Sequence, residues 1–295
     1  MKIQDTIDAL LSGDAGRRAL RVRADLDARA PEDWRTLAAV LAVLFRDREI
    51  CSVAVAGGQG SGKSTLAELI VAASKSLGRH AVCASLDDFY LTQSERRTLA
   101  EQVHPLFATR GVPGTHDVAL CRSTLVAARQ TGTVFIPRFD KSMDERYPSS
   151  QWRRVEGPVD LFVLEGWCLG ADAQPDDLLG KPANNLEARE DPQGIWRAYV
   201  NKALGGAADY CALSAMFEFF VFLAVPDMAA VVRWRTQQER ALPAAKRMED
   251  VQLRRFIDHY ERVTTWMLET APAKADLTVK LAADHTVSEV SLKSR

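Results

Sequence analysis

The chain has 295 residues, 47% of them hydrophobic and 26% charged, and its 38 basic and 39 acidic side chains leave a formal net charge of −1. This balance is ordinary for a globular protein and argues against a nucleic-acid partner, which would favour an excess of basic residues. The longest apolar runs are far shorter than a membrane span, the N-terminus has no signal-peptide pattern, and the five cysteines form no C-x-x-C pair. We therefore expect a cytoplasmic protein without a membrane partner.

The first 48 residues have the apolar spacing of amphipathic helices. Their most apolar part is TLAAVLAVLF at residues 36–45. The basic cluster RRALRVR at residues 17–23 fits a solvated helix face, because acidic residues follow it directly. We therefore predict an N-terminal helical extension over residues 1–48, ahead of the first strand.

Beyond Cys51, short apolar runs alternate with helical patterns. The runs are CSVAVA (51–56), AVCASL (81–86), TVFIP (133–137), VDLFVLE (159–165), FEFFVFLAV (217–225) and DLTVKL (276–281). Continuous apolar strands belong to a sheet that is covered on both faces, and strand–helix alternation favours parallel strands. The sequence therefore predicts a doubly wound α/β fold with a mainly parallel five-stranded sheet and flanking helices.

A complete phosphate-loop motif follows the first strand. In GGQGSGKST (57–65), Gly57, Gly62, Lys63 and Ser64 match G-x-x-x-x-G-K-[ST], and a helical pattern comes directly after them. Glycines let successive backbone N–H groups curl around a phosphate, and the following helix directs its dipole at the same anion. The predicted nucleotide-binding residues are Gly57, Gly58, Gln59, Gly60, Ser61, Gly62, Lys63, Ser64 and Thr65.

Two side chains of this loop have distinct predicted roles. Lys63 can reach the β- and γ-phosphates as a mobile positive charge, and Ser64 offers a hydroxyl to Mg²⁺. The N-K-x-D motif, which reads guanine, does not occur in the sequence. We therefore predict ATP as the nucleotide and Mg²⁺ as its metal ion.

Three carboxylates end the predicted strands beside this loop. Asp87 and Asp88 follow the second strand, and Glu165 ends the run VDLFVLE. A right-handed crossover brings the C-terminal ends of parallel strands to one edge of the sheet, so we expect all three near the Mg-triphosphate. Glu165 suits Mg²⁺ or a metal-bound water, as a Walker B-like residue does, and phosphoryl transfer needs a second carboxylate to take the acceptor's proton.

The neighbours Asp87 and Asp88 have different predicted roles. In an extended segment their side chains point to opposite faces, which argues against a pair that shares a proton. We expect one of them to face the cleft and the other to cap a helix or face solvent. The spacing alone leaves the choice between them open.

These motifs make the chain resemble the P-loop kinases that phosphorylate hydroxyls of small metabolites, such as uridine kinase, phosphoribulokinase and pantothenate kinase. Within that group it is most similar to the D-glycerate 3-kinase-like branch. The motifs that carry this similarity are SLDDFYLT (85–92), RGVPGTHD (110–117), PRFDKS (137–142), VLEGW (163–167) and RWRTQQE (233–239). The resemblance runs from about residue 50 to 270, and we predict a P-loop kinase domain over residues 49–295, with acceptor-binding insertions at about 88–158 and 168–212.

The resemblance also implies roles for side chains outside the loop. It makes Asp87 the general base, and it puts Arg233 and Arg235 on a lid-like helix beside the transferred phosphoryl group. Two residues apart on a helix, these arginines point in different directions, so we expect at most one to reach the phosphates. The predicted acceptor-binding side chains are Asp87, Tyr90, Arg110, His116, Asp117, Arg138 and Lys141.

Several of these side chains also have a structural interpretation. Asp117 directly precedes a helical pattern and fits an N-cap, and His116 fits a structural hydrogen bond. Arg110 and Arg138 suit bidentate binding of an acceptor carboxylate, although arginines of this kind also occur as plain surface residues.

The sequence therefore predicts a kinase that transfers the γ-phosphoryl group of Mg-ATP to a small metabolite, with D-glycerate as the expected acceptor and 3-phosphoglycerate as the product. Two alternatives stay open: a kinase for a nucleoside, pantothenate or a sugar phosphate, and an ATP-dependent switch or scaffold. Asp87, Arg110 and Arg138 favour a kinase, because a switch has no need of a second small-molecule pocket.

Overall fold

A computed structural model describes residues 13–206, 209–241 and 247–293. Its α-helices are α2 (Asp14–Asp25), α3 (Glu32–Asp47), α4 (Lys63–Ser76), α5 (Gln93–Gln102), α6 (Val118–Ala128), α7 (Asn185–Glu190), α8 (Ile195–Gly205), α9 (Tyr210–Ser214), α10 (Met228–Arg240) and α11 (Asp250–Lys274). Its strands are β1 (Ser52–Gly57), β2 (Ala81–Ser85), β3 (Gly132–Ile136), β4 (Phe139–Asp140), β5 (Glu145–Arg146), β6 (Arg153–Gly157), β7 (Leu161–Glu165), β8 (Phe219–Ala224), β9 (Leu277–Leu281) and β10 (Val287–Leu292). Short 3₁₀ helices are η1 (Leu86–Phe89), η2 (Pro105–Ala108), η3 (Ser149–Gln151) and η4 (Asp176–Gly180).

The central sheet has the strand order β10-β9-β8-β1-β7-β2. The five strands from β9 to β2 pair in parallel, which confirms the predicted mainly parallel sheet, and β10 pairs antiparallel with β9 at one edge. The sequence does not predict strand β10. Its sequence VSEVSL is half polar and lacks the apolar run of a buried strand. The run TVFIP lies outside this sheet: it forms β3, which pairs antiparallel with β6.

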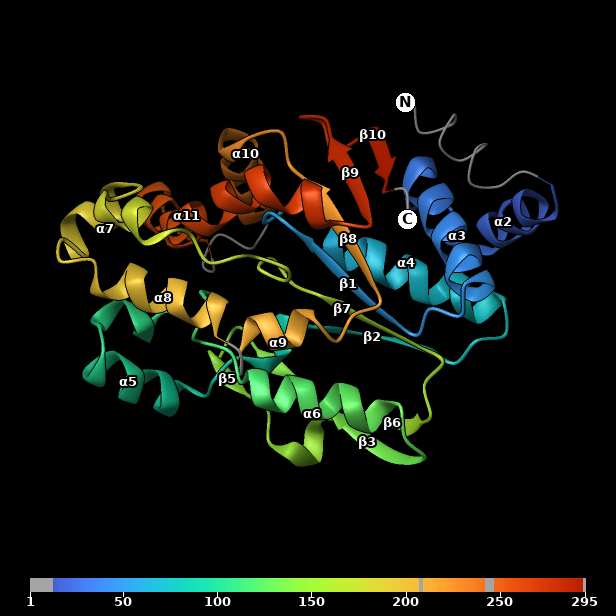
Figure 1. The fold of residues 1–295 in the computed structure, drawn as a ribbon, viewed down its shortest axis with the longest axis horizontal. Helices are drawn as coiled ribbons and strands as arrows, with labels where there is room; N and C mark the ends of the chain where they lie inside the picture. The colour runs from blue at the N-terminus through green and yellow to red at the C-terminus, as the bar shows by residue number, and fades with distance from the viewer. Residues whose placement is uncertain (1–12, 207–208, 242–246, 294–295) are drawn as a thin grey trace.

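The sheet lies between two hydrophobic clusters. In β1, Val53 and Val55 join the cluster that includes α3, α4 and α10, whereas Ala54 and Ala56 join the cluster that includes α6, α8 and α11. Figure 1 shows α3 and α4 on one side of the sheet and α6, α8 and α9 on the other. Burial on both faces explains the continuous apolar strands and confirms the doubly wound arrangement.

The N-terminal helices pack on the core of the domain. Most side chains of α3 between residues 37 and 45 are buried, and the helix packs against α4. Asp33 in the first turn of α3 accepts a hydrogen bond from Val287 N of β10 at 3.0 Å. The predicted helix over residues 1–12 lies outside the described residues, and a domain boundary at residue 48 stays a prediction.

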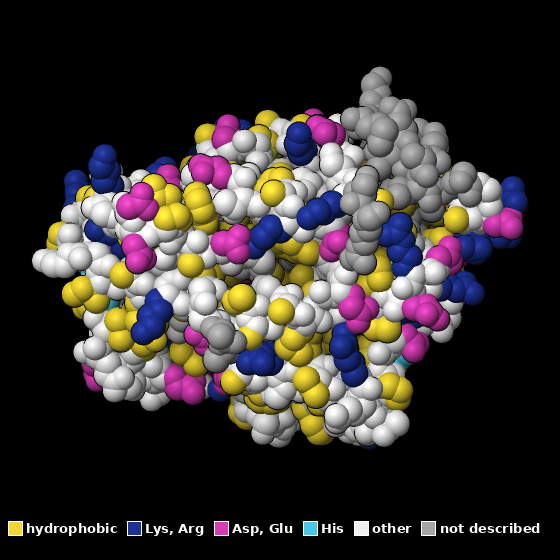
Figure 2. All heavy atoms as spheres, viewed as in Figure 1, with side chains coloured by type: hydrophobic (Ala, Val, Ile, Leu, Met, Phe, Trp, Pro, Cys, Tyr) yellow, Lys and Arg dark blue, Asp and Glu magenta, His cyan; other side chains and the backbone are white. Residues whose placement is uncertain are grey.

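The two predicted insertions carry several helices and two small sheets. Residues 88–158 contain α5, α6 and the sheets β3–β6 and β4–β5, and residues 168–212 contain α7, α8 and the first residues of α9. The helices of the described ranges lack the length and apolar character that a membrane span requires. On the face shown in Figure 2, basic and acidic side chains are interspersed, in keeping with the net charge of −1.

Candidate active site

A cavity of about 430 Å³ lies at the carboxyl edge of the sheet. Its wall includes phosphate-loop residues, Glu165, Asp87, Arg110 and Lys141. The register of the parallel strands explains why these residues lie close together. Glu165 of β7 pairs with Val55 of β1 on one side and with Ser85 of β2 on the other. Segments that are far apart in the sequence therefore share one cavity, as the parallel topology predicts.

The phosphate loop has the backbone that its glycines favour. Gly60 has a φ of 79° and Gly62 a φ of 86°, a left-handed conformation that residues with a side chain rarely adopt. A Cβ atom added at Gly60 would lie 3.0 Å from Trp234 Cβ, and one at Gly62 would lie 3.0 Å from the ring of Trp34. Because α4 begins at Lys63, its N-terminal dipole also favours an anion here. The loop is therefore shaped for a phosphate and backed by two tryptophans.

Lys63 lines the cavity, and its Nζ donates a hydrogen bond to Gly58 O at 3.0 Å. Burial lowers the pKa of this ammonium, and the negative charges of Glu165 and Asp87 oppose that shift. A bound phosphate would give Lys63 a charged partner in place of a neutral carbonyl, which is the stronger kind of hydrogen bond.

Ser64 and Glu165 form the oxygen pair expected for a metal ion. Ser64 Oγ donates a hydrogen bond to Glu165 Oε1 at 3.0 Å, and both residues line the cavity. Mg²⁺ binds oxygen ligands, keeps several waters, and in nucleotide sites takes only one or two protein groups besides the phosphates. The pair fits such an ion without a larger cluster, and the described residues contain no group of three or more His, Cys, Asp or Glu side chains arranged for a metal.

Asp87 and Asp88 lie in the 3₁₀ helix η1, so the expected extended segment is wrong at this point. The physical reason is a local cap, because Ser85 Oγ accepts a hydrogen bond from Asp87 N at 3.3 Å. The two side chains still diverge. Asp88 Oδ1 accepts a hydrogen bond from Phe139 N at 3.1 Å, whereas Asp87 lines the cavity. Asp88 thus anchors the chain at Phe139, and Asp87 faces the cleft.

The carboxylate of Asp87 has a partner on each oxygen. Tyr90 Oη donates to Oδ1 at 2.7 Å, and Lys141 Nζ donates to Oδ2 at 2.6 Å. Burial by itself would raise the pKa of this carboxyl, but Lys141 and Tyr90 outweigh it and lower the pKa to about 2. Asp87 is therefore fully ionised at neutral pH, and its side chain keeps 28% of its surface exposed.

Tyr90 joins Asp87 to a buried aromatic cluster. Its ring stacks on His116 with the centroids 4.5 Å apart, and His116 Nδ1 lies 2.5 Å from Tyr210 Oη. Burial lowers the pKa of His116 to about 4, so the imidazole is neutral at pH 7. Tyr90 lines the cavity as predicted, whereas His116 lies behind it and supports its ring.

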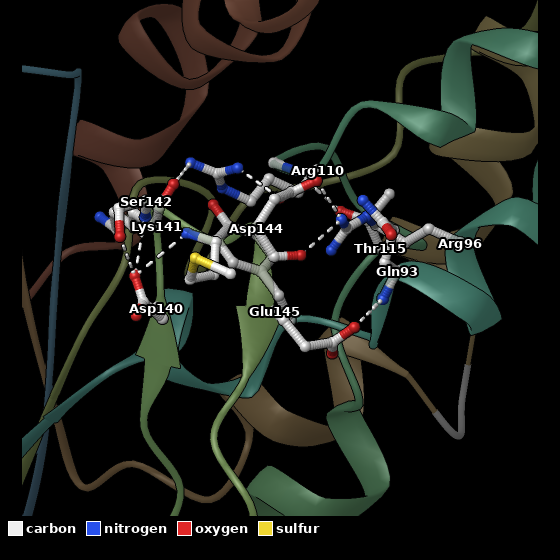
Figure 3. Close-up of polar contacts among 12 residues, drawn as sticks. Gln93, Arg96, Arg110, Thr115, Asp140, Lys141, Ser142, Asp144 and Glu145 are labelled. Atoms are coloured by element: carbon white, nitrogen blue, oxygen red, sulfur yellow. Dashed lines mark hydrogen bonds and ion pairs between the residues drawn. The ribbon is translucent and has the colours of Figure 1, made fainter. Parts of the chain in front are cut away.

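Two of the predicted acceptor-binding cations, Arg110 and Lys141, also line the cavity. Lys141 follows β4 at the tip of the β4–β5 hairpin, and Arg110 forms an ion pair with Asp144 of the same tip, as Figure 3 shows. A second cavity of about 330 Å³ shares Ser64, Asp87, Lys141 and Glu165 with the first, and Asp88 also lines it. The hairpin tip therefore contributes Lys141 to the wall of both cavities.

Two other predicted side chains lie elsewhere. Arg138 is exposed, and its guanidinium lies over the ring of Tyr147, 5.1 Å from the centroid. Asp117 is the N-cap of α6: its Oδ1 accepts a hydrogen bond from Leu120 N at 2.9 Å, and its Oδ2 lies 3.2 Å from Arg146. Neither Arg138 nor Asp117 lines the cavity, so for Asp117 the structural interpretation is the one that applies.

Of the two lid-helix arginines, Arg235 lines the cavity and Arg233 does not. The guanidinium of Arg235 lies 2.9 Å from Glu239 and sits over the ring of Phe256. Arg233 is exposed on α10. The helical spacing thus separates the two side chains as expected, and of the two only Arg235 lines the cavity that contains the phosphate loop.

Aromatic side chains from distant segments complete the wall: Trp167 belongs to the motif VLEGW but has no predicted role there, and Tyr260 lies outside every quoted motif. Trp167 and Tyr260 line the cavity, and Trp167 Nε1 donates a hydrogen bond to Gly111 O at 2.8 Å. A Cβ atom at Gly111 would lie 2.0 Å from Tyr260 Oη, so only glycine permits this approach. Gly111, the first glycine of RGVPGTHD, is the one signal in the sequence for the close contact with Tyr260.

The fold and the cavity together define a class of protein, the P-loop phosphotransferases. No protein-family model matches the sequence. The chain is 33% identical over 234 residues to the "Uncharacterized kinase mug58" of Schizosaccharomyces pombe, which covers 76% of this chain and 83% of that protein. It is 32% identical over 232 residues to the "Probable ATP-dependent kinase TDA10" of Saccharomyces cerevisiae, with 69% and 73% covered. It is 31% identical over 214 residues to the chloroplastic D-glycerate 3-kinase of Arabidopsis thaliana, with 68% and 44% covered.

A solved structure shares the fold over the whole length. The D-glycerate 3-kinase of Cryptococcus neoformans superposes with a TM-score of 0.68 at 24% identity, covering 99% of each chain. The chain therefore belongs to the family of the D-glycerate 3-kinase-like kinases that includes mug58 and TDA10. It is an ATP-dependent kinase of a small molecule. Its cytoplasmic location stays a prediction.

Proposed function

We propose that the protein transfers the γ-phosphoryl group of Mg-ATP to a hydroxyl of D-glycerate, giving 3-phosphoglycerate. One observation carries this proposal: the cavity that contains the phosphate loop is also lined by Asp87, Arg110 and Lys141. A nucleotide-dependent switch needs only the loop, whereas a kinase also needs a carboxylate and a place for its acceptor.

The phosphate loop and Lys63 would bind the triphosphate. The N-terminus of α4 favours negative charge, and Lys63 supplies a mobile cation for the β- and γ-phosphates. Ser64 and Glu165 would hold Mg²⁺, and that ion when bound neutralises charge on the phosphates. We assign Arg235 to the transferred group, because it is the lid-helix arginine that lines the cavity.

Asp87 is assigned the role of proton acceptor. The oxygen of the acceptor hydroxyl bonds to the γ-phosphorus of ATP, and the bond between that phosphorus and the β,γ-bridging oxygen breaks. ADP keeps the electron pair of the broken bond. The proton of the acceptor hydroxyl passes to the Asp87 carboxylate. A pKa of about 2 makes Asp87 a weak base, so it takes the proton late, once the forming P–O bond has made the hydroxyl acidic.

Arg110 and Lys141 would hold the acceptor. Glycerate is a small hydroxy acid, and a guanidinium binds a carboxylate with directed, charge-assisted hydrogen bonds. The relative from Arabidopsis thaliana carries the name D-glycerate 3-kinase, which supports this choice of acceptor. A nucleoside, pantothenate and a sugar phosphate are the competing acceptors, and they differ in charge and size.

An acceptor screen tests the proposal. The full-length protein with Mg-ATP is assayed for ADP release with D-glycerate, uridine, pantothenate and ribulose 5-phosphate. We expect the highest kcat/KM with D-glycerate and 3-phosphoglycerate as the product. A higher value with another compound would replace D-glycerate as the acceptor. ADP release no faster than the acceptor-free background with every compound would refute the kinase, and it would leave an ATP-dependent switch or scaffold.

A further inference from the structure

The tip of the β4–β5 hairpin, residues 140–145, holds an ion cluster beside the acceptor side of the cavity. We propose that Asp144 is a positioning residue that fixes Arg110 at the cavity wall, and that the guanidinium held in this way selects an acceptor with a carboxylate over a neutral one. The inference rests on the proposed function and deepens it, because it names the chemical class of the acceptor.

Asp144 divides its two oxygens between two arginines. Its Oδ1 pairs with Arg110 Nη1, and its Oδ2 lies 2.6 Å from Arg96 Nη2. Arg96 is fully buried, whereas Arg110 keeps 26% of its side chain exposed. Both guanidiniums also lie over the ring of Phe139, 5.7 Å and 5.5 Å from its centroid. Arg110 is therefore held on two sides, by a carboxylate and by an aromatic face.

The hairpin tip is preformed for this contact. Asp140 Oδ1 accepts hydrogen bonds from Ser142 N at 2.8 Å and from Met143 N at 3.2 Å, which closes the turn. Asp144 follows with a φ of 55°, a left-handed conformation that Asp and Asn tolerate better than most residues. Arg110 Nη2 then donates to Lys141 O at 3.3 Å, as Figure 3 shows. The backbone of the tip thus presents both Asp144 and Lys141 in fixed positions.

Arg110 is the arginine of this cluster that a ligand in the cavity can reach. Arg96 is fully buried, whereas Arg110 lines the cavity and keeps part of its side chain exposed. A carboxylate on the acceptor can form a charge-assisted hydrogen bond with the guanidinium of Arg110. A neutral acceptor cannot form that bond, so the held guanidinium favours an acceptor that carries a carboxylate.

Asp144 does not itself line the cavity, so it acts through Arg110. We therefore expect Asp144→Asn to raise KM for D-glycerate by about ten- to a hundredfold, the size of one charge-assisted hydrogen bond, with kcat and the KM for ATP within about twofold of wild type. Asparagine keeps the side-chain size and tolerates the left-handed backbone, so the hairpin is retained.

The matched control is Glu145→Gln, which removes the same charge from the next residue of the same hairpin. Glu145 Oε2 accepts a hydrogen bond from Gln93 N at 3.2 Å and makes no bond to Arg110. We expect this variant to keep the KM for D-glycerate within about twofold, since it leaves the Asp144–Arg110 pair intact. An equal rise of KM in Glu145→Gln and Asp144→Asn would mean that general hairpin charge, and not the pair, sets the affinity.

Two further readouts separate positioning from folding. The ratio of kcat/KM for D-glycerate over glycerol, which lacks the carboxylate, should fall in both Asp144→Asn and Arg110→Gln. Adding Asp144→Asn to Arg110→Gln should cause no further rise in KM, because the two residues act as one unit. Additive effects, or an unchanged glycerate-to-glycerol ratio, would overturn the role of Asp144.

The wild-type screen keeps the two proposals apart. If D-glycerate or another carboxylate such as pantothenate gives the highest kcat/KM, the carboxylate inference is supported, and the variants are compared with that acceptor. If uridine or ribulose 5-phosphate gives the highest value, the protein is still a kinase but the carboxylate inference is overturned. If no compound is phosphorylated, the proposed function fails and the inference fails with it.

Discussion

The two halves of the cavity are built in opposite ways. The phosphate half comes from the nine consecutive residues 57–65, whose glycines and helix start determine its shape locally. The acceptor half gathers Asp87, Arg110, Lys141 and Tyr260 from separate segments, and ion pairs at a hairpin tip hold it together. The phosphate loop is therefore encoded in a short motif, whereas the proposed acceptor site depends on contacts that only the folded chain creates.

The largest effect should come from the phosphate half. We expect Lys63→Met to lower kcat/KM for ATP by about a thousandfold, because it removes the mobile cation of the loop. The control is Lys75→Met, which changes an exposed lysine near the other end of the same helix and should have little effect. Steady-state kinetics measure both variants, and similar losses in the two would contradict a specific role for Lys63.

The boundary between the halves lies at Asp87 and Asp88. We expect Asp87→Asn to lower kcat by about a hundred- to a thousandfold while ATP binding, measured by calorimetry, is retained. Asp88→Asn should reduce kcat by less than about threefold, because the amide oxygen can still accept the hydrogen bond from Phe139 N. Equal losses of kcat in the two variants would show that the proton acceptor has been assigned to the wrong residue.

The lid helix offers a second pair of neighbouring residues. Arg235→Ala should lower kcat by about ten- to a hundredfold, since Arg235 lines the cavity and can stabilise charge on the transferred group. Arg233→Ala, on an exposed position two residues away, should stay within about twofold of wild type. A larger loss from Arg233→Ala would reverse the assignment.

The smallest expected effect is a change in pH dependence on the acceptor side. Lys141 helps to hold the pKa of Asp87 at about 2, below its ordinary value, whereas burial pushes it up. Because the reaction needs Asp87 ionised, its acid limb in wild type lies near that pKa, and kcat/KM stays flat with respect to Asp87 above pH 5. Lys141→Met should move this limb to higher pH. A pH–rate profile that keeps its shape in Lys141→Met would contradict the ion pair's role.

The sequence predicts the fold well where burial leaves a clear pattern. The five parallel strands are mainly apolar, and they confirm the predicted sheet, whereas β10 is not predicted because its sequence is half polar. The meeting of Ser64 and Glu165 also follows from the motif and the strand order, although their roles stay proposals.

The acceptor side is less predictable for a physical reason. Arg110 and Arg138 look equivalent as residues, and only the hairpin determines that Arg110 faces the cavity while Arg138 lies over Tyr147. Asp144 belongs to no motif, and its partner Arg96 is 48 positions away. Such pairs are set by tertiary packing, so neither spacing nor periodicity indicates them.

The hydrogen bond from Val287 to Asp33 joins positions 254 residues apart, and β9 and β10 bury side chains in the same cluster as α3. At synthesis rates of about 5–20 residues per second, roughly ten to fifty seconds pass between the emergence of these two positions from the ribosome. During that interval α3 can pack on α4, but the side chains that β9 and β10 contribute to the same hydrophobic cluster are still missing. This half of the domain can therefore complete its core only after β9 and β10 have been synthesised, so its folding depends on contacts of long sequence separation.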